Sequence, residues 1–280
     1  MARPVPKGSA VITKTAIKVE ALSKTYGRGA AAVHALQDIS FEVAAGDFVS
    51  IVGPSGCGKT TLLQCMSGLL SPTGGTVSVF GTEVTKPIED LALVFQDYSR
   101  SLFPWLTADG NVRFPLRSRG LSKSEVRDRS RESLVAVGLE GYEQLYPWQM
   151  SGGMQQRVAI ARGIALRPRV LLMDEPFASV DAQTRCDLED LTLKLWAEIG
   201  VTVLFVTHDI DEAVYVSNRV VVLSLPPTLV DSEMLISLSR PRDQVSTKEG
   251  PEFGHLRADL FRRVMGLREA KRTTDAPLTA

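Results

Sequence analysis

Short apolar, β-rich runs alternate along the chain with segments whose apolar residues recur at helical spacing. This alternation is typical of a mostly parallel β-sheet flanked by helices, so it predicts an α/β fold. The expected strands are Ile17–Ala21, Ile39–Val43, Phe48–Val52, Thr76–Phe80, Ala92–Phe95, Val170–Met173, Thr202–Thr207 and Arg219–Leu223. The last four are continuous apolar runs, which indicates strands buried on both faces.

The pattern changes between Asp109 and Leu166, where no convincing strand occurs and three helix-like stretches follow one another. This region therefore indicates a helical insertion. One stretch opens with Ser122 and has Glu125 three residues later, the spacing of a capping box in which the two residues satisfy each other's free amides.

Both ends of the chain differ from the middle. Residues 1–16 carry scattered Arg and Lys without the apolar centre of a signal peptide, and we interpret them as a disordered lead. After Leu225 come Pro226-Pro227, a polar segment, an expected amphipathic helix over Leu256–Met265 and a polar tail. We therefore divide the chain into a lead (1–16), a main domain (17–225) and a C-terminal extension (226–280).

The charge balance and the cysteines exclude several function classes. Lys plus Arg and Asp plus Glu number 32 each among 280 residues, so no net field favours nucleic acid as a partner. No apolar run reaches the roughly 20 residues needed to span a bilayer. Three cysteines without a CxxC spacing suggest neither a disulfide framework nor a zinc site, and fit a reducing cytoplasm.

A phosphate-binding loop follows the predicted strand Phe48–Val52. The sequence matches G-x-x-x-x-G-K-[ST] between a strand and a helix, where backbone amides and the helix N-terminus can cradle phosphates. Lys59 is expected to reach the β- and γ-phosphates of a nucleotide, and Thr60 to bind Mg²⁺. The residues of this loop are Gly53, Pro54, Ser55, Gly56, Cys57, Gly58, Lys59, Thr60 and Thr61.

Cys57 allows two interpretations. It fits the loop as a small residue, which we favour. The alternative is a reactive thiol whose pKa is lowered by Lys59 and the helix N-terminus.

Two carboxylates end the buried strand Val170–Met173. Ligands of open α/β sheets bind at the carboxyl ends of the strands. Asp174 at the strand tip suits a contact to Mg²⁺, and Glu175 suits the general base that activates water.

Two further strand ends carry polar side chains. His208 follows the strand Thr202–Thr207 and could donate a hydrogen bond to the γ-phosphate. Gln96 follows Ala92–Phe95 and could contact Mg²⁺ and the water. His34 and His255 are interpreted as structural.

A second glycine pair stands at Ser151-Gly152-Gly153, before a helical run. A serine hydroxyl and free amides at a helix start are anion donors, although no anion site is evident nearby. An ordinary N-cap with glycine beside it is the structural alternative.

Taken together, these motifs resemble the ATP-binding cassette (ABC) ATPases over about Ile17 to Leu225. The resemblance implies a P-loop NTPase fold with a mostly parallel central sheet, an N-terminal antiparallel β part and a helical subdomain over about residues 97–166. It implies ATP and Mg²⁺ as cofactors, with Thr60, Gln96 and Asp174 around the metal. It implies the following further roles: Glu175 the base, Gln96 the Q-loop, His208 the switch histidine, Ser179 to Asp181 the D-loop and Tyr26 the aromatic residue that stacks on adenine. A half-buried strand residue is the alternative for Tyr26.

The same resemblance implies a second copy of the ATPase. In this family the signature of one subunit closes on the ATP of the other, so Ser151, Gly152, Gly153 and Asp181 would serve a neighbour's nucleotide in a homodimer or a pair of ATPase subunits. Met150 and Met154 stand where Leu and Gln are usual, and Val180 replaces the usual Leu of the D-loop.

Finer matches resemble importer ATPases for nitrate, aliphatic sulfonates and taurine. They lie in Phe95–Tyr98, Leu102–Thr107 and Asp209–Val214. The implied protein is peripheral at the cytoplasmic face of the membrane, with Ser99–Thr107 as the socket for separate permease subunits and a solute-binding protein as an indirect partner. The alternatives are a soluble ABC ATPase of translation or DNA repair, and an exporter ATPase.

Overall fold

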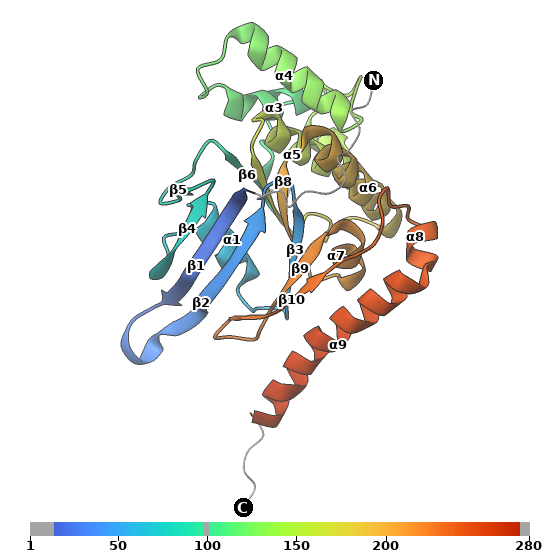
Figure 1. The fold of residues 1–280 in the computed structure, drawn as a ribbon. Coiled ribbons are helices and arrows are strands. Elements are labelled where there is room, and N and C mark those ends of the chain that lie inside the picture. The colour runs from blue at the N-terminus through green and yellow to red at the C-terminus, as the bar shows by residue number, and fades with distance from the viewer. Residues whose placement is uncertain (1–13, 98–100, 275–280) are drawn as a thin grey trace, which may run out of the picture.

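The computed structural model describes residues 14–97 and 101–274. It contains two β-sheets with helices packed around them (Figure 1). The first sheet has the strand order β2-β1-β4-β5, and the second has the order β10-β9-β3-β8-β7-β6. This is the predicted α/β class, with an antiparallel N-terminal sheet beside a mostly parallel one.

The first sheet is built on a long hairpin. Its strands are β1 (Thr15–Tyr26), β2 (Val33–Ala44), β4 (Gly74–Val79) and β5 (Thr82–Glu83). β1 and β2 each run for 12 residues, far beyond the predicted short strands. Register shifts in the pairing and a positive φ of 48° at Ala21 let β1 continue past an irregularity that interrupts the apolar pattern.

The second sheet carries the predicted buried strands. Its strands are β3 (Phe48–Val52), β6 (Leu91–Val94), β7 (Val170–Asp174), β8 (Thr202–Val206), β9 (Arg219–Leu223) and β10 (Val230–Leu235). The first five of these are mutually parallel, and β10 pairs antiparallel with β9 at the edge. Strand β10 was not predicted from the sequence, because a half-exposed edge strand mixes polar and apolar residues.

Parallel pairing decides where the functional side chains meet. The carboxyl ends of β3, β6, β7 and β8 lie at one edge of the sheet. The loop after each strand therefore opens toward the same space.

The helices lie on both faces of the second sheet. They are α1 (Lys59–Met66), α3 (Ala108–Leu116), α4 (Lys123–Ala136), α5 (Gly152–Ala165), α6 (Ala182–Ile199), α7 (Ile210–Val216), α8 (Ser246–Glu249) and α9 (Pro251–Thr274), with 3₁₀ turns at Gly29–Ala31 and Pro147–Gln149. One core cluster joins α1 and the first sheet to one face through Leu62, Val49 and Leu204. The other joins α5, α6 and α7 to the opposite face through Phe48, Met173 and Phe205.

The predicted helical stretch is confirmed. Residues 109–166, all of which the structure describes, contain helices and turns but no strand. The predicted capping box is also present: Ser122 Oγ accepts from the Glu125 amide at 3.2 Å, and the Ser122 amide donates to Glu125 Oε2 at 2.9 Å. Helices α3, α4 and α5 pack on one another at the top of Figure 1.

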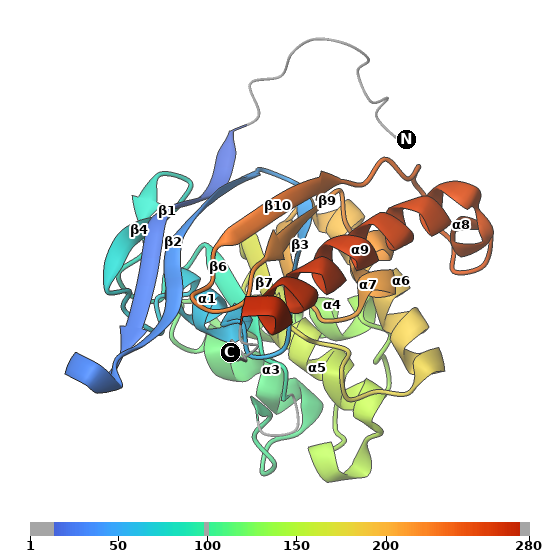
Figure 2. The same cartoon turned by 90° about the horizontal axis from the view of Figure 1, so that it is seen from below.

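The C-terminal helix is longer than predicted. It begins at Pro251, a residue well suited to the first turn of a helix, and runs to Thr274. Phe253, Leu260 and Val264 join the second core cluster, and α9 packs along α7 (Figure 2). Most of the predicted disordered lead lies outside the described residues, and its last two residues belong to β1. No helix within 14–97 or 101–274 has the length and apolar character to cross a membrane.

Candidate nucleotide-hydrolysis site

The loop between β3 and α1 has the backbone that phosphate binding requires. Gly56 and Gly58 have φ of 77° and 91°, where a side chain is strained, and Gly58 is the N-cap of α1. Lys59 is only 6% exposed, and its Nζ donates to the carbonyls of Gly53 at 3.1 Å and Pro54 at 3.3 Å. The ammonium group is thus held over its own loop, beside the free amides of the helix start.

Cys57 is part of the packing beneath this loop. A Cβ atom at Gly53 would lie 2.9 Å from Cys57 Sγ and 3.0 Å from the Leu223 carbonyl, so the sulfur and the glycine fit together. Cys57 is fully buried, and burial raises the pKa of its thiol against the smaller opposing effect of Lys59. The reactive-thiol alternative is therefore wrong, and the small-residue interpretation stands.

We expect Cys57 of the native protein to react with iodoacetamide at least about tenfold more slowly than the half-buried Cys186, because the thiolate is both rare and inaccessible. Timed alkylation followed by peptide mass spectrometry measures both rates. Equal rates would contradict the packing described for Cys57, and unfolding in denaturant should abolish the difference.

Asp174 ends β7 as a buried carboxyl with spare hydrogen-bonding capacity. It is 6% exposed, and its Oδ1 has no hydrogen-bond partner among the described residues. Burial raises the pKa of Asp174, while a hydrogen bond from the Thr60 side chain opposes that rise. A buried carboxylate oxygen beside a threonine hydroxyl is the kind of oxygen donor set that Mg²⁺ takes, so these two residues fit a metal ion.

Glu175 is the point at which four segments meet. Its carboxylate accepts a hydrogen bond from Gln96 Nε2 at 3.1 Å and lies 2.8 Å from His208 Nδ1. Lys59 Nζ lies 3.8 Å from the other carboxylate oxygen. The Glu175 backbone has φ of 41°, an uncommon conformation for a residue with a side chain, and its amide donates to the Val206 carbonyl at 2.8 Å. A carboxylate oriented in this way can act as a general base toward a water molecule.

The phosphate loop and this carboxylate line one cavity of about 510 Å³. Its volume is in the range of small-ligand sites. The lining residues are Ser55, Gly56, Cys57, Gly58, Lys59, Thr60, Thr61, Glu175 and His208. The predicted base Glu175, the predicted switch histidine His208 and the phosphate loop therefore line the same cavity.

Tyr26 lies at the end of β1, near the start of α1. Its hydroxyl is 3.3 Å from Thr61 Oγ1, and the residue is 41% exposed. An exposed ring at this position is compatible with stacking on a base, although Tyr26 does not line the described cavity. Its adenine role stays a prediction.

The second glycine pair lies elsewhere. Ser151 caps α5 by accepting from the Met154 amide at 3.3 Å, and Asp181 caps α6 by accepting from the Thr184 amide at 3.0 Å. A Cβ atom at Gly153 would lie 2.5 Å from the Thr184 methyl group, so the two helix starts pack closely. Within the described chain, the lining of the phosphate-loop cavity includes neither the Ser151-Gly152-Gly153 segment nor Asp181.

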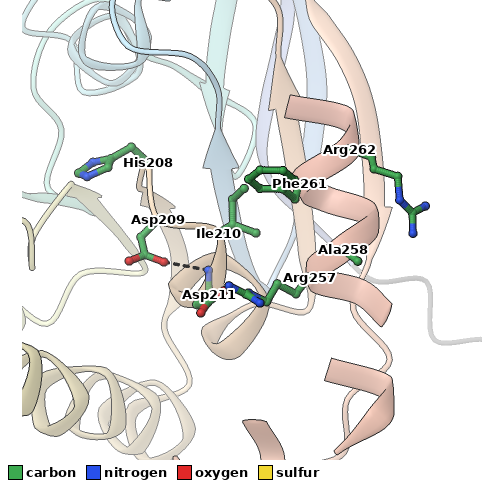
Figure 3. Close-up of a pocket in the computed structure, with 8 residues that line it drawn as sticks. All are labelled: His208, Asp209, Ile210, Asp211, Arg257, Ala258, Phe261 and Arg262. Atoms are coloured by element: carbon green, nitrogen blue, oxygen red, sulfur yellow. Dashed lines mark hydrogen bonds and ion pairs between the residues drawn. The ribbon is translucent and has the colours of Figure 1, made fainter. Parts of the chain in front are cut away.

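A larger hollow of about 710 Å³ separates the start of α7 from α9. Figure 3 shows Phe261 and Arg257 directed toward α7, whereas the His208 ring points away from α9. Arg257 pairs with Asp211 across the hollow. This contact was not predicted from the sequence, because the two residues are 46 positions apart.

Comparison with known proteins agrees with this geometry. The family model described as "ABC transporter" matches residues 36–178. An uncharacterized ABC transporter ATP-binding protein of Methanocaldococcus jannaschii is 49% identical over 83% of this chain and 86% of its own length. The aliphatic sulfonates import ATP-binding protein SsuB of Bacillus thuringiensis subsp. konkukian is 41% identical over 82% of this chain and 90% of its own.

Solved structures extend the likeness to the fold. A dimeric ATP-binding cassette in a post-hydrolysis state, bound to ADP and Pi, superposes with a TM-score of 0.70 at 36% identity. The superposition covers 79% of this chain and 98% of the cassette. The family match, the similarity of whole chains and the shared fold agree, and we conclude that the chain belongs to the ATP-binding proteins of ABC transporters, which bind and hydrolyse ATP.

Proposed function

We propose that this ATPase energises uptake of a small anion, such as nitrate, an aliphatic sulfonate or taurine, through a separate membrane permease. The similarity to an aliphatic sulfonates import ATP-binding protein, at 41% identity over most of both chains, supports import and this substrate class. In this proposal the protein is peripheral at the cytoplasmic face of the membrane, and a solute-binding protein supplies the permease.

For hydrolysis, we assign Glu175 as the general base, with Gln96 and His208 orienting it. The hydrogen bonds of Gln96 and His208 to the Glu175 carboxylate support this assignment. Lys59 and the loop amides would bind the ATP phosphates. Thr60, Gln96 and Asp174 would hold Mg²⁺, which would supply positive charge beside the phosphates.

For assembly, we assign the second glycine pair to a neighbouring copy. Ser151, Gly152 and Gly153 of one subunit would face the ATP on the phosphate loop of the other, with Asp181 at the same interface. The free amides at the start of α5 and their absence from the lining of the chain's own cavity support this assignment. Two ATP-binding sites would then form between two subunits.

The observation that carries the permease assignment is an apolar groove beside the Gln96 segment. The groove has a volume of about 350 Å³, and Phe95, Phe103 and Phe114 contribute to its lining. Phe95 is 41% exposed and Phe114 is 46% exposed. Trp105, which is 71% exposed, lies beside Phe103 with ring centroids 5.4 Å apart and ring planes tilted by 41°. Exposed aromatic residues gathered around a groove mark a site for another protein.

We expect Trp105→Ala to weaken copurification with the cognate permease by at least about tenfold, because Trp105 is exposed beside the groove residue Phe103 and the loss of an aromatic anchor costs about 2 kcal/mol at an interface. The matched control is Trp148→Ala, since Trp148 is 72% exposed but stacks on Tyr146, which does not line the groove, whereas Trp105 contacts the groove residue Phe103. Basal ATP hydrolysis should be unchanged in both variants.

The full transporter tests the function. Subunit and permease reconstituted in vesicles should show ATP-dependent uptake of labelled nitrate, an alkanesulfonate or taurine. Permease-stimulated ATPase activity without uptake of any of the three would overturn the substrate class. Efflux would favour an exporter, and copurification with ribosomes or DNA in place of a permease would favour the soluble ATPase.

A further inference from the structure

A buried carboxyl group lies close behind the hydrolysis site. Glu212, on the first turn of α7, is 4% exposed. Its Oε2 accepts a hydrogen bond from Thr207 Oγ1 at 2.6 Å, and its other oxygen lies 3.5 Å from Arg185 Nε. Neither Thr207 nor Glu212 contacts the phosphate loop through a described hydrogen bond or ion pair. Thr207 instead directly precedes His208 in the chain, and its hydroxyl binds the amide of Asp209, the residue after His208.

Thr207 fixes the backbone on both sides of His208. Its own amide donates to the Ile51 carbonyl of β3 at 3.1 Å. Its hydroxyl donates to Glu212 and accepts from the Asp209 amide at 2.9 Å. The residues before and after His208 are therefore held by one hydroxyl, whose own orientation depends on the Glu212 carboxyl as acceptor.

The carboxylate of Asp209 holds the start of α7, on the other side of His208. It accepts from the amide of Asp211 at 2.8 Å (Figure 3) and from the amide of Glu212 at 3.1 Å. Arg185 lies 3.2 Å from the second oxygen of Asp209 and also approaches Glu212. Arg185 belongs to α6, the helix that Asp181 caps. The cluster thus connects the loop of His208 to the helix that begins at Asp181.

The residues Arg185, Thr207, Asp209 and Glu212 also lie beside Glu175, the proposed base. A small, partly open space of about 10 Å³, close to the volume that one water molecule needs, is lined by both Glu175 and Glu212. The residues that line it are Glu175, Ala178, Arg185, Thr207, His208, Asp209 and Glu212. Glu212 therefore lines the same space as Glu175 and His208, the two residues that the hydrolysis reaction is proposed to use.

We propose that Glu212 is a positioning residue for ATP hydrolysis: through Thr207 it fixes His208, and thereby Glu175, and through Arg185 it joins this loop to the helix of Asp181. The inference rests on the roles proposed above for Glu175 and His208. Burying the Glu212 carboxylate costs solvation free energy, because the side chain is only 4% exposed. A buried ionisable group next to a reaction site is more often functional than a residue that only fills space.

The charge of Glu212 changes near neutrality. Burial is the largest cause that raises the pKa of Glu212 to about 7, and Asp209 and Glu189 add to it while Thr207 and Arg185 oppose it. Arg185 and Glu189 face it from α6, and Asp209 faces it from the loop. His208, and Glu175 at the end of β7, share the small space. Above pH 7 the ionised carboxyl accepts from Thr207 and attracts Arg185, whereas the protonated carboxyl leaves Arg185 to Asp209.

The test compares Glu212→Gln with the parent protein in steady-state ATP hydrolysis from pH 6 to pH 8. At pH 8 the variant should have a kcat about tenfold lower, with KM for ATP changed by less than about twofold, because displacement of positioned groups slows chemistry without touching the phosphate loop. At pH 6 the parent residue is mostly neutral, as the amide is, so the kcat ratio should approach one. A kcat ratio that stays flat from pH 6 to pH 8 would overturn the proposal.

Two further variants separate positioning from general damage. Glu189→Gln removes another buried carboxyl, on α6, which binds Gln244 and Lys248 and does not line the small space. It should keep the parental kcat, and an equal loss in this control would overturn the proposal. Thr207→Val and Glu212→Leu each remove the hydrogen bond between Thr207 and Glu212, which Glu212→Gln can keep through its amide oxygen. Each should lower kcat about tenfold at pH 8, and the double variant should be no slower than either single variant, because both remove the same link. Additive losses would contradict a shared path.

Thermal unfolding separates a positioning role from a structural one, because the two roles predict opposite changes in the melting temperature of Glu212→Gln at pH 8. The folded pKa of about 7 lies above the ordinary 4.5, so the native state loses stability as pH rises between these values. Glu212→Gln escapes this loss. It should therefore melt at a higher temperature than the parent at pH 8 and at a similar temperature at pH 5. A lower melting temperature at pH 8 together with a lower kcat would identify a structural residue. If Glu175→Gln itself kept the parental rate, the proposed base would fail independently of this result.

Discussion

The Glu175→Gln protein should bind ATP as the parent does and hydrolyse it at least about 100-fold more slowly, the scale usual for removing a positioned general base. The amide keeps the shape of the side chain and can still accept from Gln96 Nε2, so the arrangement at the end of β7 should persist. What disappears is the negative oxygen that takes a proton from water. Lys59 also loses its 3.8 Å carboxylate partner, which leaves its ammonium group freer to meet phosphate.

Single-turnover hydrolysis and equilibrium nucleotide binding measure the two halves of this prediction separately. Lys59→Ala is the complementary variant, since it should weaken ATP binding itself. Hydrolysis by Glu175→Gln near the parental rate would mean that another group is the base. Unchanged ATP affinity in Lys59→Ala would contradict the assignment of the phosphate loop.

The meeting of Gln96, Asp174, Glu175 and His208 was predictable because each residue ends or follows a strand of one parallel sheet. Strand ends can be recognised locally, from an apolar run that stops at a polar residue. Parallel pairing then places these ends at one edge without any knowledge of individual contacts. The loop at Gly53 to Thr61 was predictable for a similar reason, because its glycines, lysine and helix start are contiguous in sequence.

Contacts between distant segments could not be predicted in this way. The link from Arg185 to Glu212 joins residues on two helices, and both types are usually exposed, so nothing local marks them as buried partners. The extension of β1 to Tyr26 depends on pairing with β2 past a backbone irregularity. The edge strand β10 has a polar, half-exposed sequence that also suits a loop. Each of these depends on tertiary packing that overrides local preference.

Gly153 has a role that the sequence did not indicate. The Thr184 methyl group would lie 2.5 Å from any Cβ atom at Gly153, so the glycine is needed for the packing of α5 against α6 whether or not it also meets a nucleotide. Ser151 likewise caps α5 in the single chain. These roles within one chain are compatible with a contact to the ATP of a second subunit. They also determine which variant can test that contact.

The last prediction concerns two copies of the chain. If Ser151 and Gly152 complete the neighbour's site, ATP becomes part of the interface, and the hydrolysis-deficient Glu175→Gln protein should accumulate as a closed dimer with two ATP molecules. Ligand that binds mainly the assembled state favours assembly by mass action, by about 2.7 kcal/mol per site at 100 times its Kd. The protein should sediment as a dimer with ATP and as a monomer or weaker dimer without it. The solved dimeric cassette to which the chain is similar makes this arrangement structurally reasonable.

Gly152→Asp in the Glu175→Gln background separates this interface from a plain helix cap. Gly153 is unsuitable for the purpose, because any side chain there would disturb Thr184 within one subunit. A carboxylate at 152 would face the γ-phosphate across the interface, and two unit charges about 4 Å apart repel by about 4 kcal/mol at an effective dielectric constant of about 20. ATP-dependent dimerisation should therefore weaken by at least about 100-fold, whereas ATP binding to the single chain should survive on its untouched phosphate loop. The measurement belongs at high protein concentration and low salt. If the double variant dimerises on ATP as tightly as Glu175→Gln alone, Ser151 and Gly152 only begin a helix, and the proposed shared site is wrong.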